Sequence, residues 1–249
     1  MLGWGLTPDL RCYESLIDIH SHHGDGGAAV AVLDRIEAAG LAPSNETYRR
    51  LLHGLGAAGD LARAAQVYAR LRAVGIPPDS AILGRLFRAV RNHAQLVRTE
   101  ASRKMAALPG TNAPARRAAA AERSARLAEA YVSLLSWQGD MVAAGVRHDA
   151  VTLRHLLGAL ERVNAVSDCI RLAQLHEQMR PGDLGAHRHA LKAAGRLRTP
   201  AAAGHTQQLA ARLSEGGSLS REEYLVLLFS QFWLHGDKGQ ARGAGFVCA

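Results

Sequence analysis

Residues 40–79 read GLAPSNETYRRLLHGLGAAGDLARAAQVYARLRAVGIPPD, and this stretch decides the fold. It begins and ends with a Gly-x-x-Pro connector followed by a polar residue. Between the connectors, the spacing of Tyr48, Leu51 and Leu52 places three apolar side chains on one stripe of a helix. A Gly-Asp pair at 59–60 then stops this helix and caps a second one. The stretch therefore predicts two helices joined by a tight turn.

The same pattern recurs at an interval of 35 residues on both sides of this stretch. The connector glycines are Gly5, Gly40 and Gly75, and the apolar triplets are Tyr13, Leu16, Ile17, then Tyr48, Leu51, Leu52, then Leu83, Leu86, Phe87. Because proline cannot continue a helix, each connector separates one helical pair from the next. A single hairpin cannot bury its apolar stripe alone, so the repetition predicts an all-α chain of stacked hairpins.

The residues from Gly5 to Pro109 resemble the pentatricopeptide repeat family. Its signature combines an aromatic residue near the start of the first helix, a paired apolar step, a glycine at mid-repeat, an Ala-rich second helix and a closing Gly-Leu/Ile-x-Pro-Asp. Residues 40–79 follow this signature from end to end. The resemblance implies a right-handed α-solenoid of stacked helix-turn-helix repeats, whose concave face holds an extended chain.

The period divides the chain into units. We expect the end of a preceding repeat or a linker at 1–9, repeat units at 10–44 and 45–79, a degenerate unit with a basic second helix at 80–114, a divergent Arg/Ala-rich helical unit at 115–149, a further repeat-like unit at 150–180, degenerate helical repeats or a cap at 181–240 and a loose tail at 241–249. Because the first residues fall within the end of a repeat, we also expect sequence upstream of this chain.

Composition and motifs exclude several classes of protein. The chain is 48% hydrophobic but has no apolar run long enough to span a membrane, and its three cysteines do not form a disulfide framework or a Cys-x-x-Cys zinc site. The histidine cluster at 20–23 offers at most two ligands on one helical face, so we predict neither a metal nor a cofactor. No phosphate-binding loop, nucleophile elbow or metalloprotease motif is present, which favours a non-catalytic protein.

Positive charge is concentrated in one segment. Residues 85–130 contain ten basic and three acidic residues, a net +7 in a chain whose total is +8. We predict a phosphate-binding patch of Arg85, Arg88, Arg91, Arg98, Arg103, Lys104, Arg116 and Arg117, continued by Arg123 and Arg126. A solvated helix face or a surface for an acidic partner protein would show the same charge.

The resemblance also implies that repeats bind single-stranded RNA one base at a time. The base-facing positions are the residue after the first-helix aromatic and the last residue of the repeat, with a stacking position nearby. Carried onto this chain, the base-facing set is Arg11, Glu14, Ser44, Arg49, Asp79, Val151 and Arg154. An ionised Glu14 repels phosphate, and Arg49 could pair with Asp79, so we expect weak base-specific readout.

The resulting hypothesis is a non-catalytic RNA-binding helical-repeat protein. The resemblance implies a mitochondrial or chloroplast setting, although the chain shows no targeting peptide, and a role in transcript processing, stability, translation or ribosome association. Single-stranded or ribosomal RNA is the expected partner, and a membrane is not. A protein-interaction scaffold in a large organellar assembly, or a processing factor with a catalytic domain on further sequence, are the alternatives.

Overall fold

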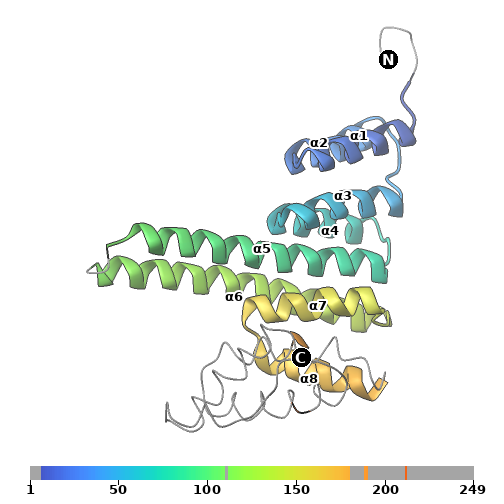
Figure 1. The fold of residues 1–249 in the computed structure, drawn as a ribbon. Helices are drawn as coiled ribbons and strands as arrows, with labels where there is room; N and C mark the ends of the chain where they lie inside the picture. The colour runs from blue at the N-terminus through green and yellow to red at the C-terminus, as the bar shows by residue number, and fades with distance from the viewer. Residues whose placement is uncertain (1–6, 110–111, 180–187, 190–210, 212–249) are drawn as a thin grey trace, which may run out of the picture. The chain divides into compact units, whose positions relative to one another are not determined.

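The computed structural model describes residues 7–109, 112–179, 188–189 and 211, and all regular structure among them is helical (Figure 1). The chain divides into two compact units, Met1–Ala159 and Leu160–Ala249. The helices are α1 Leu10–His22, α2 Gly26–Ala38, α3 Asn45–Ala58, α4 Leu61–Ala73, α5 Ser80–Ala107, α6 Ala113–Ala143, α7 Ala150–Val163 and α8 Val166–Met179. Apart from 188–189 and 211, the cap expected at 181–240 and the tail expected at 241–249 lie outside the described residues.

Each connector ends one helix and begins the next through the same local chemistry. Gly40, Gly75 and Gly145 adopt left-handed φ angles of 70°, 82° and 65°, which cost a glycine little. The polar residue at the end of each connector then caps a first helix. Ser44 Oγ accepts a hydrogen bond from Thr47 N at 3.1 Å, and Asp79 and Asp149 accept equivalent bonds at 2.7 Å. The same glycine turn and the same kind of N-cap therefore recur with the repeat period.

The apolar triplets form the core between successive helices. Tyr48, Leu51 and Leu52 are buried, as are Leu83, Leu86 and Phe87 one period later. Leu153, Leu156 and Leu157 are buried two periods further on. Because the first helices α1, α3 and α5 pack side by side, each triplet is covered by the neighbouring hairpin.

Glycines set the distance between the first helices. A Cβ atom on Gly54 would lie 2.3 Å from Ser21 Oγ on α1, and one on Gly56 would lie 2.8 Å from the Arg85 carbonyl oxygen on α5. Gly84 likewise lies against Thr152 on α7, where a Cβ would meet Oγ1 at 3.2 Å. The helices therefore approach closely because these positions have no side chain.

The structure differs from the predicted units at 80–114 and 115–149. Residues 80–107 form one helix of 28 residues and 113–143 form another of 31, so this segment is a single long hairpin rather than two short ones. The second helix predicted within 80–114 is the distal half of α5. The reason lies at 94–95, where the period would place the Gly-Asp turn of 59–60 but the chain has Ala94-Gln95, which continue a helix.

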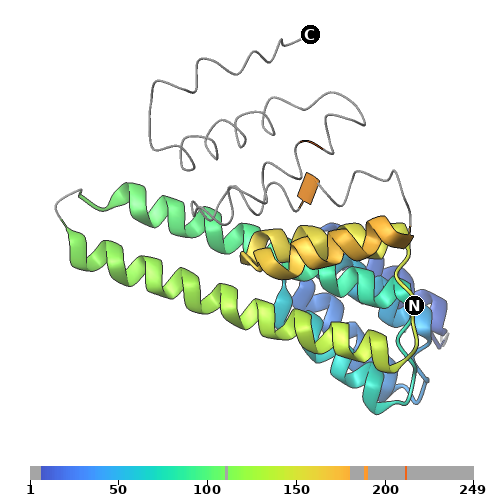
Figure 2. The ribbon, with the colours of Figure 1, turned by 90° about the horizontal axis from the view of Figure 1, so that it is seen from below.

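Both long helices extend past the shorter hairpins, and we call their distal part, residues 94–130, the arm (Figures 1 and 2). Since α5 is 14 residues longer than α3 (28 against 14), it reaches about 21 Å further. Ala94, Val97 and Ala101 are its buried residues on α5, and Leu127 and Ala130 are those on α6.

On the opposite side of the hairpins, α6 packs against α4. The Tyr68 hydroxyl donates to Asp140 at 3.0 Å, Arg72 pairs with Asp140 at 2.5 Å, and the rings of Tyr68 and Trp137 meet edge to face with centroids 6.1 Å apart. These contacts keep the long hairpin in register with the preceding one. None of the helices that the structure describes is long and apolar enough to cross a bilayer.

Candidate nucleic-acid interface

The first helices of successive hairpins present one continuous surface, which we call the first-helix face. It consists of the exposed side chains of α1, α3, the proximal half of α5 and the beginning of α7. The close contacts of Gly54, Gly56 and Gly84 hold these helices next to one another. All seven base-facing residues predicted from the sequence lie on this face or at its edge.

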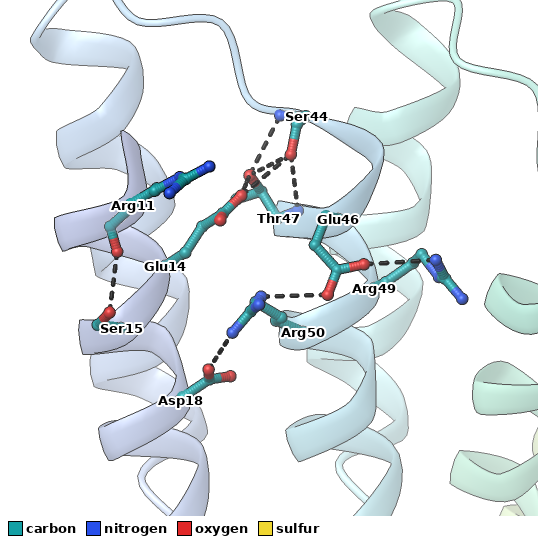
Figure 3. A network of polar contacts seen from close by, with 9 residues as sticks. All are labelled: Arg11, Glu14, Ser15, Asp18, Ser44, Glu46, Thr47, Arg49 and Arg50. Carbon is teal, nitrogen blue, oxygen red and sulfur yellow. Dashed lines mark hydrogen bonds and ion pairs between the residues drawn. The ribbon is translucent and has the colours of Figure 1, made fainter. Parts of the chain in front are cut away.

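At the α1–α3 end of the face, the predicted base-facing residues contact each other (Figure 3). Glu14 accepts hydrogen bonds from Ser44 Oγ at 3.0 Å and from Thr47 Oγ1 at 2.8 Å. The structure therefore brings together the two residues predicted to read one base, Glu14 and Ser44. Both residues are thus already hydrogen-bonded within the fold, and the Glu14 carboxylate can only accept further hydrogen bonds.

Ion pairs balance the charges of the acidic and basic side chains at the same end of the face. Arg50 contacts both Asp18 on α1 and Glu46 on its own helix, and Arg49 Nη1 lies 3.3 Å from Glu46 (Figure 3). Arg49 thus pairs with Glu46, and not with Asp79 as the sequence suggested. Three acidic and three basic side chains, counting Glu14 and Arg11, leave this end with no excess charge.

Asp79 and Val151 differ in how accessible their side chains are to a ligand. Asp79 Oδ1 caps α5, and its other oxygen lies 3.5 Å from Asn45 Nδ2. The Val151 side chain is 58% exposed at the start of α7, and Arg154 is exposed one turn further along. Val151 could therefore contact a base from the side, whereas Asp79 is committed to a structural role.

Towards α5 and α7 the first-helix face becomes strongly positive. Arg85, Arg88, Arg91 and Arg154 form what we call the cationic cluster, with two histidines beside it. Burial and the nearby Arg91, Arg88 and Arg154 lower the pKa of His155 to about 4. Burial, Arg88 and Arg85 also lower the pKa of His53. Both histidines are therefore neutral near pH 7, because burial and then the neighbouring arginines disfavour the protonated ring.

Arg85 belongs to the predicted phosphate-binding patch, and its neighbour Arg49 belongs to the predicted base-facing set. Burial and the neighbouring Arg49 lower the pKa of the Arg85 guanidinium. Arg85 Nη1 donates a hydrogen bond to the Ala81 carbonyl oxygen at 2.8 Å. Within the described residues, Arg88 and Arg154 make no ion pair with a carboxylate. Guanidinium groups in such a position are suited to bidentate contact with phosphate.

The remaining predicted patch residues lie on the arm. Lys104 pairs with Glu100 and with Glu122 across the hairpin at 3.0 Å, and Arg126 pairs with Glu100 at 2.7 Å. Arg98, Arg103, Arg116 and Arg117 also lie on the arm. The predicted patch therefore extends along α5 from the first-helix face onto the arm, and Arg88 and Arg103 are 15 residues apart, or about 22 Å.

The sequence pattern did not predict His53 and His155 as part of the site. Their signal was nevertheless present, because His53 and Arg88 are one period apart, and Arg50, Arg85 and His155 are one and two periods apart. Arginine or histidine thus recurs at the same repeat positions of the first helices. Among the described residues, no group of three or more histidines, cysteines or carboxylates lies close enough to hold a metal ion.

Stacked helical hairpins with a polar first-helix face define a helical-repeat protein. Residues 32–82 match the model of the pentatricopeptide repeat domain, so the chain contains pentatricopeptide repeat sequence and the resemblance is confirmed there. No curated protein sequence matches the chain.

Solved structures similar to this chain include two of the pentatricopeptide repeat protein PPR10. The maize protein is 16% identical with a TM-score of 0.45, over 92% of this chain and 32% of that one. PPR10 in complex with an 18-nt psaJ RNA element is 15% identical with a TM-score of 0.36, over 97% of this chain and 40% of that one. The chain thus spans less than half the length of either.

Proposed function

We propose that this chain binds single-stranded RNA without catalysis, by phosphate contacts to the cationic cluster. The observation that carries the proposal is the position of Arg88 and Arg154 on the first-helix face, where neither makes an ion pair with a carboxylate within the described residues. Burial, and then Arg91, Arg88 and Arg154, lower the pKa of the nearby His155 to about 4. A phosphate backbone supplies the missing negative charge. The pentatricopeptide repeat sequence at 32–82 and the RNA bound by PPR10 support RNA as the polyanion.

Base-specific reading plays a small part in this proposal. The hydrogen bonds of Glu14 with Ser44 and Thr47 occupy the first predicted reading position, and Arg49 pairs with Glu46 at the second. Breaking these contacts would cost free energy before a base could bind. We therefore expect the protein to bind oligonucleotides of different sequence with similar affinity.

The test is fluorescence anisotropy with labelled oligouridine and oligoadenosine of about four nucleotides, which are too short to reach the arm from the cationic cluster. Arg88→Gln with Arg154→Gln should weaken binding of both RNAs about tenfold, because two charge-assisted contacts are lost. Arg116→Gln with Arg117→Gln, which removes the same charge from the arm, is the matched control and should leave these affinities unchanged. Equal losses in both variants, or none in either, would contradict the proposal.

The alternative function is that of a protein-interaction scaffold, for which this test gives a different result. In that case neither RNA would bind more tightly at low salt, and an acidic protein would have to be sought instead. The organellar setting and the role in transcript processing, stability or translation belong to the proposal as implications of the family resemblance. They require localisation of the protein and sequencing of the RNA that it retains on purification.

A further inference from the structure

The arm carries basic side chains at its tip that the first-helix face does not use. Arg103 on α5 and Arg116, Arg117 and Arg123 on α6 lie at or beyond the Lys104–Glu122 ion pair, towards the turn between the two helices. Among the described residues none of the four makes an ion pair with a carboxylate, and Arg103, Arg117 and Arg123 are exposed. We call these four residues the tip cluster.

The ion pairs below the tip hold the two helices together. Glu100 contacts both Lys104 and Arg126, and Glu122 contacts Lys104 from the opposite helix. Glu100 and Glu122 are thus paired with Lys104 and Arg126, neither of which belongs to the tip cluster. The tip cluster keeps its charge for a ligand, on two helices whose relative position is fixed.

The surroundings of the tip cluster favour phosphate over bases or apolar groups. No aromatic residue occurs between Ala101 and Ser124, so the tip offers no platform on which a base could stack. It also lacks the large buried anchors that dominate protein interfaces. Instead, alanines at 113, 115 and 118–121 leave room beside Arg116 and Arg117 for a sugar–phosphate backbone to approach.

We propose that the tip cluster is a second RNA-binding site, which contacts the phosphate backbone of RNA that extends past the first-helix face. The proposal rests on the RNA binding proposed above. The nearest members of the two clusters on α5, Arg91 and Arg103, are 12 residues apart, or about 18 Å. An oligonucleotide of about four nucleotides spans only about 14 Å at about 3.4 Å per nucleotide, so one bound at the cationic cluster does not reach the tip. A longer RNA occupies both sites and gains affinity from the second at high effective concentration.

Three RNA probes test the second site. They are an oligouridine of about four nucleotides, one of about thirty, and the shorter one extended by a stem of about twelve base pairs. Arg116→Gln with Arg117→Gln should bind the shortest RNA like the unmodified protein, but bind at least one extended RNA about tenfold more weakly than it does. The RNA for which affinity is lost identifies single-stranded or double-stranded backbone as the ligand.

The same experiment separates the two proposals. If Arg88→Gln with Arg154→Gln weakens binding of the shortest RNA while the arm variant binds all three probes like the unmodified protein, the second site is contradicted and the first stands. An arm variant that loses affinity for the shortest RNA as strongly as for the longer ones would also contradict a separate site. Circular dichroism and a thermal melt establish that both variants keep their helices.

Discussion

The carboxylate of Glu14 on α1 accepts a hydrogen bond from Thr47 Oγ1 on α3 at 2.8 Å. Thr47 is fully buried, and its hydroxyl also completes the capping box of α3 with Ser44. A residue at a position that faces RNA in the resembled family is thus part of the contact between two repeats. Three predictions on stability and charge follow from this and the neighbouring contacts, and a fourth concerns RNA binding.

Replacement of Glu14 by alanine should destabilise the protein by about 1 kcal/mol, because the Thr47 hydroxyl loses its partner on α1 but keeps the one at Ser44. The free energy of unfolding from urea titration measures the effect. Glu129→Ala is the control, since this exposed glutamate on α6 makes no ion pair within the described residues. Equal stability of the two variants would show that the Glu14 contact contributes nothing.

Two glycine substitutions should change stability in opposite directions. Gly56→Ala places a Cβ 2.8 Å from the Arg85 carbonyl oxygen, so α3 and α5 must separate, at a cost of about 1–3 kcal/mol. Gly139→Ala on α6 meets nothing within 4 Å and should stabilise the protein by about 0.5–1 kcal/mol through helix propensity. The urea midpoints of the two variants check this. A Gly56→Ala protein as stable as the parent would contradict the close helix packing.

His155 should titrate far below an ordinary histidine, near pH 4, and its pKa should rise when the cationic cluster is neutralised. The native state keeps His155 neutral while the unfolded chain binds a proton near pH 6.5, so this residue makes stability fall as the pH falls from about 6.5 to 4. An NMR titration with and without Arg88→Gln measures the shift. A pKa near 6.5 in the unmodified protein would show that the arginines do not surround His155.

Much of the fold could be predicted because the signals are local. Pro43, Gly75 and Asp79 determine turns and caps within a few residues, and the buried triplets follow helical spacing. The long hairpin could have been predicted too, from the absence of glycine at 94–95. It was missed because the connector-like segment at 110–114 maintains the period, yet α6 already begins at Ala113 within it.

The site was harder to predict because it depends on contacts between helices. The sequence identified Arg49, Arg85 and Arg88 as basic, but it could not show which arginines have carboxylate partners. Arg50 and Arg49 are neutralised by Asp18 and Glu46, from another helix or from the turn before, whereas Arg88 is not. Charge counted along the chain therefore does not show which arginines are balanced by a carboxylate on another helix.

The salt dependence of RNA affinity tests the central claim most directly. The affinity of the unmodified protein for an oligouridine of about four nucleotides, plotted as log K against log salt, should fall with a slope that becomes shallower by about 1.4 in Arg88→Gln with Arg154→Gln, or about 0.7 for each lost contact with a single strand. The slope should be unchanged in Arg116→Gln with Arg117→Gln. A slope near zero in the unmodified protein, or the same slope in all three proteins, would contradict phosphate binding by the cationic cluster.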